Sequence, residues 1–139
     1  MKPVLLDTGC IIAALDRSER NHPACSEALS QIDAPLVTCE AVIAEACYIL
    51  RNMGGAADAV LANVETGAFQ VPFRIGTSAG PVRKLMAKYG KRKMDFADAC
   101  LVHLANELDT GRILTLDDDF DVYRWKRSRP FQRLVRRVP

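Results

Sequence analysis

The chain has 139 residues, of which 49% are hydrophobic and 26% are charged, a composition typical of one folded domain and not of a disordered segment. The formal net charge of +2 argues against a uniformly basic nucleic-acid binder, and no apolar run reaches the roughly 18 residues of a transmembrane helix. Five cysteines without a CxxC pair favour reduced core thiols in a cytoplasmic protein.

Short apolar runs alternate with longer helical patterns along the chain. We predict strands at 3–6, 35–37, 69–71, 112–116 and 131–135, and helices at 8–16, 23–32, 39–52, 56–65, 78–89, 96–108 and 118–125. Strands that alternate with helices indicate βαβ units and an α/β fold with a parallel sheet covered on both faces. In such sheets ligands bind beyond the carboxyl ends of the strands, so the residues that follow each strand are candidates for chemistry.

The first such residue is Asp7, directly after the strand at 3–6. An ionised side chain at the end of a buried strand is costly to desolvate unless it has a partner. One interpretation makes Asp7 a functional carboxylate, and the other makes it the N-cap of the next helix.

Glu45 is the only charged residue between positions 41 and 50. A helix that is apolar on all sides is expected to be buried. A carboxylate in its middle must then be paired, protonated or bound to a cation. The structural alternative is an ion pair with an arginine such as Arg51 or Arg112.

Asp95 and Asp98 open the predicted helix at 96–108, after a basic run at 91–93. Their spacing of three residues places both carboxylates on one face of the helix, one turn apart. The same arrangement is favourable for helix capping, because both residues complement the positive end of the helix dipole. Function and capping therefore both remain open for this pair.

Three consecutive carboxylates, from Asp117 to Asp119, follow the predicted strand at 112–116. One of them is expected to cap the next helix. Acidic side chains gathered at the carboxyl end of a strand are nevertheless suited to hold a hard cation.

Taken together, the acidic residues predict one site. If the first and fourth strands are neighbours, Asp7 and Asp117 meet at the switch point of the sheet, with Glu45 and Asp98 on the flanking helices. Four carboxylates without a convergent lysine repel one another at low dielectric, and Mg²⁺ or Mn²⁺ relieves that repulsion. The chain has two histidines, which argues against a zinc site.

The charge is distributed unevenly along the chain. Residues 122–139 carry seven basic and no acidic side chains. This basic C-terminal segment indicates a polyanion partner or, alternatively, a solvated terminus. We expect one domain over residues 1–139 that includes this segment.

The four acidic motifs, in this order, resemble those of the PIN domain, and more narrowly those of the VapC-type ribonuclease toxins of bacterial toxin–antitoxin pairs. The resemblance spans residues 4 to about 123. The residues that carry it are Leu5-Leu6-Asp7-Thr8-Gly9, Glu45, Met94-Asp95-Phe96-Ala97-Asp98-Ala99 and Thr115-Leu116-Asp117-Asp118-Asp119-Phe120.

The resemblance implies a three-layer α/β/α sandwich whose parallel sheet has the strand order 3-2-1-4-5. It implies that the metal ligands and catalytic acids are Asp7, Glu45, Asp98 and Asp117. Asp119 is the second choice for the fourth ligand, and Asp95 matches a further acidic position. Thr8 and Thr115 match hydroxyl positions near the site.

The implied function is metal-dependent hydrolysis of RNA, as the toxin of a type II toxin–antitoxin pair, with a small antitoxin partner and a homodimeric assembly. An acidic centre needs basic residues nearby to hold RNA, and the candidates are Lys91, Arg92, Lys93 and Arg124. Two alternatives remain. One is a non-catalytic RNA- or protein-binding domain, and the other is a Mg²⁺-dependent phosphatase, although Gly9 stands where a phosphatase of the Asp-x-Asp type needs an aspartate.

Overall fold

A computed structural model describes all residues from Met1 to Pro139. Its central sheet has the strand order β3-β2-β1-β4-β7, and every neighbouring pair is parallel. The strands are β1 (Val4–Leu6), β2 (Leu36–Val37), β3 (Phe69–Gln70), β4 (Arg112–Leu114) and β7 (Gln132–Arg133). Because β7 is the fifth strand of this sheet in chain order, the predicted order 3-2-1-4-5 and the α/β class are confirmed.

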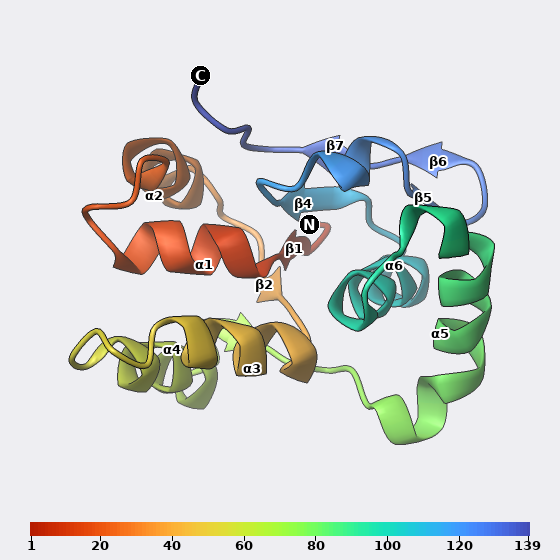
Figure 1. Cartoon of the computed structure of the whole chain (residues 1–139), viewed down its shortest axis with the longest axis horizontal. Coiled ribbons are helices and arrows are strands. Elements are labelled where there is room, and N and C mark those ends of the chain that lie inside the picture. Colours follow the sequence, from red (N-terminus) through yellow and green to blue (C-terminus); the bar gives the residue numbers. More distant parts are fainter.

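Helices flank the sheet on both sides. In Figure 1, α1 and α2 lie to the left of the strands and α5 and α6 to the right, while α3 and α4 lie below. Their bounds are α1 (Thr8–Leu15), α2 (His22–Ser30), α3 (Glu40–Ile49), α4 (Ala56–Glu65), α5 (Ile75–Lys88) and α6 (Phe96–Leu108), with 3₁₀ turns η1 (Gly90–Arg92) and η2 (Asp118–Asp121). No helix is long and apolar enough to cross a membrane.

The innermost strand, β1, is buried along its whole length. Leu5 lies in register with Val37 of β2 and with Ile113 of β4. Strands covered on both faces are expected to be continuously apolar, and Val4-Leu5-Leu6 has that pattern. The helix α6 is buried from Ala97 to Ala105, so both of these elements are fixed firmly in the core.

The predicted helix at 118–125 is replaced by the short turn η2 and an antiparallel hairpin. Its strands, β5 (Arg124–Trp125) and β6 (Arg129–Pro130), form a separate two-stranded sheet. The Trp125 indole donates a hydrogen bond to the Pro130 carbonyl and packs so closely on Gly111 that a Cβ there would overlap it. This tertiary packing favours the hairpin over the local helical pattern.

The burial of helix α3 also differs from the prediction. Its apolar sequence predicts burial on all sides, but only Val42 and Ala46 are buried, and Tyr48 is 65% exposed. The helix packs on α1, α4 and α6. Ala41, Ile43 and Cys47 are half-buried against the core, whereas Ala44, Tyr48 and Ile49 are exposed. The uniform apolar pattern therefore indicates an exposed apolar face, and Glu45 is itself exposed.

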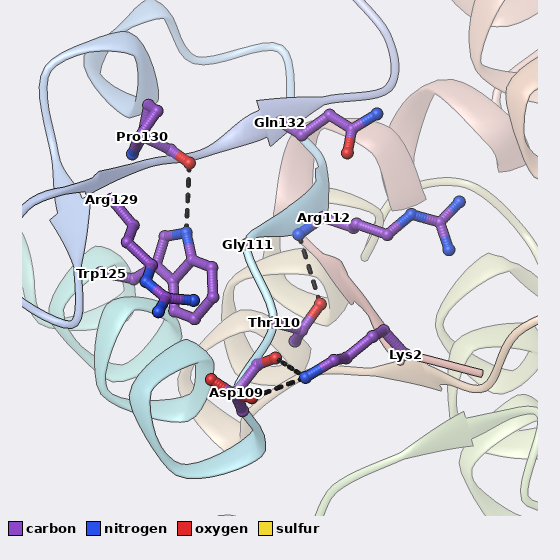
Figure 2. Close-up of a pocket in the computed structure, with 9 residues that line it drawn as sticks. All are labelled: Lys2, Asp109, Thr110, Gly111, Arg112, Trp125, Arg129, Pro130 and Gln132. Carbon is purple, nitrogen blue, oxygen red and sulfur yellow. Dashed lines mark hydrogen bonds and ion pairs between the residues drawn. The ribbon is translucent and has the colours of Figure 1, made fainter.

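A hollow of about 260 Å³ lies beside residues that precede or begin β1, β4 and β7 (Figure 2). Lys2 and Asp109 form an ion pair, and the Arg129 guanidinium lies 5.2 Å from the centroid of the Trp125 ring. Lys2 donates to both the backbone oxygen and the carboxylate of Asp109, and the backbone NH of Arg112 donates to Thr110. Asp109 is its only acid, so the carboxylates predicted to form a site are not here.

Candidate active site

Carboxylates from four parts of the chain line one hollow of about 180 Å³. Asp7 follows β1 and Asp117 follows β4, so the two neighbouring strands deliver them to the same edge of the sheet. The helix α3 contributes Glu45, and the start of α6 contributes Asp95 and Asp98. The remaining residues of the lining are Thr8, Gly9, Ala97, Leu116 and Arg137.

Asp7 is 8% exposed and is held by two hydrogen bonds. The backbone NH of Thr8 donates to Oδ1 at 2.8 Å, and the hydroxyl of Thr115 donates to Oδ2 at 2.7 Å. Burial outweighs both hydrogen bonds and, with the charges of Asp117 and Glu45, raises the pKa of Asp7 to about 6. Asp7 is therefore both the N-cap of α1 and a member of the acidic cluster, so the two interpretations coexist.

Asp98 is 6% exposed, and its pKa is raised further than that of Asp7. Burial is the main cause that raises its pKa to about 8, followed by the charges of Asp95, Asp7 and Asp117. The hydroxyl of Tyr123 donates to Asp98 Oδ2 at 3.1 Å. Sequence reasoning did not identify Tyr123, and no motif around it indicates this role.

Asp95 is the N-cap of α6 and accepts from the backbone NH of Asp98 at 2.8 Å. The capping interpretation is thus correct for Asp95. Its carboxylate also lines the hollow and raises the pKa of Asp98. One residue therefore starts the helix and adds negative charge to the site.

The three aspartates after β4 have different surroundings. Carboxylate oxygens of Asp98, Asp117 and Asp119 lie within 4.8 Å of one another. Asp117 lines the hollow, whereas Asp119 is engaged by Arg92 at 2.8 Å. The side chain of Asp118 is 81% exposed and pairs with Arg133. Both choices for the fourth ligand therefore lie next to Asp98.

Glu45 forms no ion pair with Arg51 or Arg112. Arg51 instead stacks its guanidinium over the Tyr48 ring, 3.9 Å from the centroid, and donates to the Tyr48 carbonyl. The structure therefore contradicts the alternative in which Glu45 pairs with one of these arginines. Glu45 reaches the hollow from its exposed edge.

The donor set fits a hard divalent cation. Five carboxylates line the hollow against a single cation, Arg137. The hydroxyl oxygen of Thr8 is buried there without a hydrogen-bond partner. The two histidines lie elsewhere: His22 bonds to the Ala13 carbonyl, and His103 packs edge-on against Phe73. All-oxygen donors with excess negative charge suit Mg²⁺ or Mn²⁺, not zinc.

The basic C-terminal segment folds back onto the acidic turn. Arg133 donates to Asp118, Asp121 and the Thr115 carbonyl, and Arg136 pairs with Asp121. Arg137 donates from Nε to the Leu116 carbonyl at 2.9 Å. Arg133 therefore stabilises the turn that carries Asp117, and its burial contradicts the solvated-terminus alternative at that position, whereas Arg136 and Arg137 are exposed.

Removal of the Arg133 charge is expected to destabilise the fold. The side chain is fully buried, so Arg133→Met keeps the apolar stem but leaves the Thr115 carbonyl and the Asp118 carboxylate without this donor, while Asp121 keeps Arg136. We expect the free energy of unfolding to fall by about 2 kcal/mol, measured by urea denaturation.

Arg136→Met is the matched control. Its side chain is 62% exposed, and exposed ion pairs contribute about 0–1 kcal/mol. Equal losses in the two variants would contradict a specific role of Arg133 in holding the turn.

The four predicted substrate-binding residues make different contacts and do not form one cluster. Lys91 and Lys93 are exposed and form no ion pair. Arg92 pairs with Asp119, next to the acidic hollow. Arg124 turns back and donates to the carbonyls of the three residues that precede it.

Comparisons with known proteins agree with this geometry. The family model described as PIN domain matches residues 4–126. The chain is 31% identical over 116 residues to Ribonuclease VapC26 of Mycobacterium tuberculosis. The aligned region covers 82% of this chain and 86% of that protein. The crystal structure of VapC20 of Mycobacterium tuberculosis, described as a sarcin-ricin loop cleaving toxin, matches 91% of this chain and 99% of its own with a TM-score of 0.79 and 17% identity. At that identity the match shows a shared fold.

Proposed function

Because the chain belongs to the PIN domain family, and within it to the VapC-type ribonucleases, we propose that it is a metal-dependent endoribonuclease and the toxin of a type II toxin–antitoxin pair. The observation that carries the proposal is the convergence of Asp7, Glu45, Asp98 and Asp117 on one hollow. These residues are separated by up to 110 positions in sequence, and helix capping alone gives no reason for them to meet.

The proposed ligands of Mg²⁺ or Mn²⁺ are Asp7, Asp98, Asp117 and Glu45, with Asp95 as a further acid. Asp117 is preferred to Asp119 because Asp119 is neutralised by Arg92. When bound, the cation supplies positive charge to the phosphate and lowers the pKa of a water molecule.

The residues around these carboxylates position them. Thr115 holds Asp7 at Oδ2 and also accepts from the backbone NH of Asp117 at 3.0 Å, so one hydroxyl couples two of the proposed ligands. Tyr123 fixes Asp98. Rigid support of this kind matters because catalytic groups lose activity when they are displaced by about 1 Å.

Arg137 is the one cation of the hollow and the proposed contact to the substrate phosphate. Its Nε is anchored on the Leu116 carbonyl, which leaves the two terminal nitrogens for a phosphate oxygen. We expect Arg137→Lys to lower kcat/KM for RNA roughly 10- to 100-fold, mostly in kcat if the contact strengthens in the transition state.

Steady-state kinetics with a labelled oligonucleotide measures this effect, with Arg136→Lys as the neighbouring control. Unchanged kcat and KM in Arg137→Lys would exclude a substrate contact for this guanidinium.

The proposed activity is tested directly with purified protein and labelled RNA. Cleavage in Mg²⁺ or Mn²⁺, its loss in EDTA, and its recovery on adding excess metal support the nuclease. Intact RNA in every condition, with a folded protein that still binds RNA, supports the non-catalytic alternative. Release of phosphate from a phosphomonoester without RNA cleavage supports the phosphatase.

An exposed apolar face supports the proposed antitoxin and homodimer. Tyr48 and Ile49 of α3, Met53 in the turn after it, and Leu61 of α4 are exposed, and exposed apolar patches mark protein interfaces. Sedimentation of the purified chain, alone and with any small protein that co-purifies, tests both partners. A monomer that co-purifies with nothing would contradict them.

A further inference from the structure

We propose that a basic hollow between α5 and the β5–β6 hairpin binds phosphates of the RNA backbone, apart from the acidic hollow; this inference rests on the proposed function. The cavity has a volume of about 280 Å³ and contains no acid. Four cations line it, together with Pro81, Leu85 and Asn106: Lys84, Lys88, Arg124 and Arg127.

None of the four cations is neutralised by a carboxylate. The ion pairs of the basic residues elsewhere account for Lys2, Arg92, Lys126, Arg133 and Arg136, and none of them involves this cluster. Lys84 and Lys88 lie one turn apart on α5, a spacing at which like charges destabilise a helix. Four unpaired cations around one cavity repel one another, and an anion relieves that repulsion.

The cavity is built from fixed groups. Arg124 Nη1 donates to three backbone carbonyls, and its backbone NH donates to the Tyr89 hydroxyl at 3.0 Å. Lys88 Nζ lies 5.3 Å from the centroid of the Tyr89 ring. These contacts hold part of the positive charge in place before a ligand arrives, which reduces the entropy lost on binding.

The hairpin turn presents Arg127 at a conformational cost. Lys126 and Arg127 have φ values of 43° and 73°, in the left-handed region that favours glycine. Contacts explain Lys126, because its Nζ pairs with Asp109 and its backbone NH donates to Asn106. Arg127 has no such contact within the protein. Two consecutive residues with positive φ are the usual geometry of a tight hairpin turn, and this turn places the unpaired Arg127 in the lining of the basic cavity.

Two tyrosines in edge-on contact link Arg124 of the basic cavity to Asp98 of the acidic hollow. Tyr89 packs edge-on against Tyr123, with centroids 5.0 Å apart, and Tyr123 bonds to Asp98. Nearby, Arg92 of the 3₁₀ turn after α5 pairs with Asp119. Asn106 of the basic cavity and Asp98 of the acidic hollow lie eight residues apart on α6, about 12 Å along the helix axis, so the two sites are separate places on one helix.

The chemistry favours backbone phosphates over bases. No aromatic residue lines the cavity, so an aromatic platform on which bases would stack is absent. Lysine and arginine contacts to phosphate position a strand without reading its sequence. Binding through this cavity is therefore expected to depend strongly on salt and weakly on sequence.

The test measures binding without cleavage. Fluorescence anisotropy of labelled single-stranded RNA is recorded in EDTA at several salt concentrations, with Asp7→Asn as the parent protein. Lys84→Gln combined with Lys88→Gln is expected to weaken binding roughly tenfold at 0.1 M salt and to reduce the salt slope by about 0.7 for each phosphate that is no longer neutralised. Arg127→Gly is expected to weaken binding several-fold while the melting temperature stays equal or rises.

Arg17→Gln is the matched control, because Arg17 is exposed, unpaired, and located in the loop between α1 and α2. Equal affinity of the control and the cavity variants would overturn the inference. Polyglutamate of the same total charge as the RNA is tested as a competitor. If polyglutamate displaces the RNA, and the same variants weaken polyglutamate binding, the cavity is assigned to an acidic protein segment instead. Because no metal is present, these outcomes are independent of nuclease activity. RNA binding through the cavity, combined with intact RNA in the separate assay of the unmodified protein with Mg²⁺ or Mn²⁺, would refute only the proposed function.

Discussion

Replacement of Asp7 with asparagine is expected to lower RNA cleavage at least about 100-fold, since loss of residues that merely orient metal ligands already costs 10- to 100-fold. The substitution preserves shape. The amide oxygen still accepts from the backbone NH of Thr8, as Asp7 Oδ1 does. The amide NH₂ takes the place of Oδ2 and donates to the Thr115 hydroxyl oxygen, which reverses the direction of that hydrogen bond. The variant therefore removes charge from the hollow while the N-cap of α1 remains.

Asp118→Asn is the control for this experiment. Asp118 belongs to the same acidic set, but its side chain is 81% exposed and turned toward Arg133. It loses the same charge without touching the hollow, so its cleavage rate should stay within about twofold of the parent, as expected for exposed sites. Full activity of Asp7→Asn, or equal loss in both variants, would contradict the proposed role of Asp7.

Asp98→Asn is expected to stabilise the metal-free protein. Asp98 is almost fully buried among other acids, and its pKa is raised to about 8, so its charged form opposes folding at neutral pH. An asparagine keeps an acceptor for the Tyr123 hydroxyl and carries no charge. The gain should be on the order of 2 kcal/mol, or roughly 6–10 °C in Tm for a chain of this size, measured by thermal denaturation in EDTA.

The effect of Asp98→Asn should depend on pH in a defined direction. The folded-state pKa values of Asp7 and Asp98, about 6 and about 8, lie above the ordinary value of 3.8. Their contribution to stability is therefore complete below about pH 4 and is lost as the pH rises through 6 and 8. The metal-free parent should be more stable at pH 5 than at pH 8, and its difference from Asp98→Asn should shrink toward low pH.

Divalent metal should reverse the order of the two proteins. Ligand that binds only the native state raises stability by RT ln(1 + [L]/Kd). Mg²⁺ or Mn²⁺ should therefore raise the Tm of the parent, and this rise should be smaller in Asp98→Asn. An equal metal-induced shift in both proteins would remove Asp98 from the proposed ligands, whatever the outcome of the cleavage assay.

Local patterns were sufficient for most of the fold. The bounds of α4 and α6 agree with the predicted helices at 56–65 and 96–108, because both are bounded by clear signals, a Gly pair before α4 and the Asp95 cap before α6. Local reasoning failed at residues 122–130, where contacts distant in sequence, Trp125 against Gly111 and Pro130, decide in favour of a hairpin.

The carboxylates of the site were identifiable from the sequence because charge at the end of an apolar strand, or inside an apolar helix, has a desolvation cost that calls for a reason. That reasoning selected Asp7 and Glu45, and the parallel order of the strands predicted that they would converge with Asp98 and Asp117. For Glu45 the premise of a helix buried on all sides was wrong, since Glu45 is exposed and only Val42 and Ala46 of α3 are buried.

Which cation faces which anion was decided by the tertiary structure alone. The sequence contains a basic C-terminal segment without a visible partner, and only the pairing of β7 with β4 brings Arg133 onto the acidic turn and Arg137 into the hollow. Tyr123 reaches Asp98 because it follows η2 and packs edge-on against Tyr89 and Phe120. Ion pairs and hydrogen bonds form between groups that are close in space, so residues far apart in the chain acquire partners only when the backbone is folded. Hydrophobic periodicity and helix capping depend on residues that are neighbours in sequence, and both can therefore be read from the chain itself.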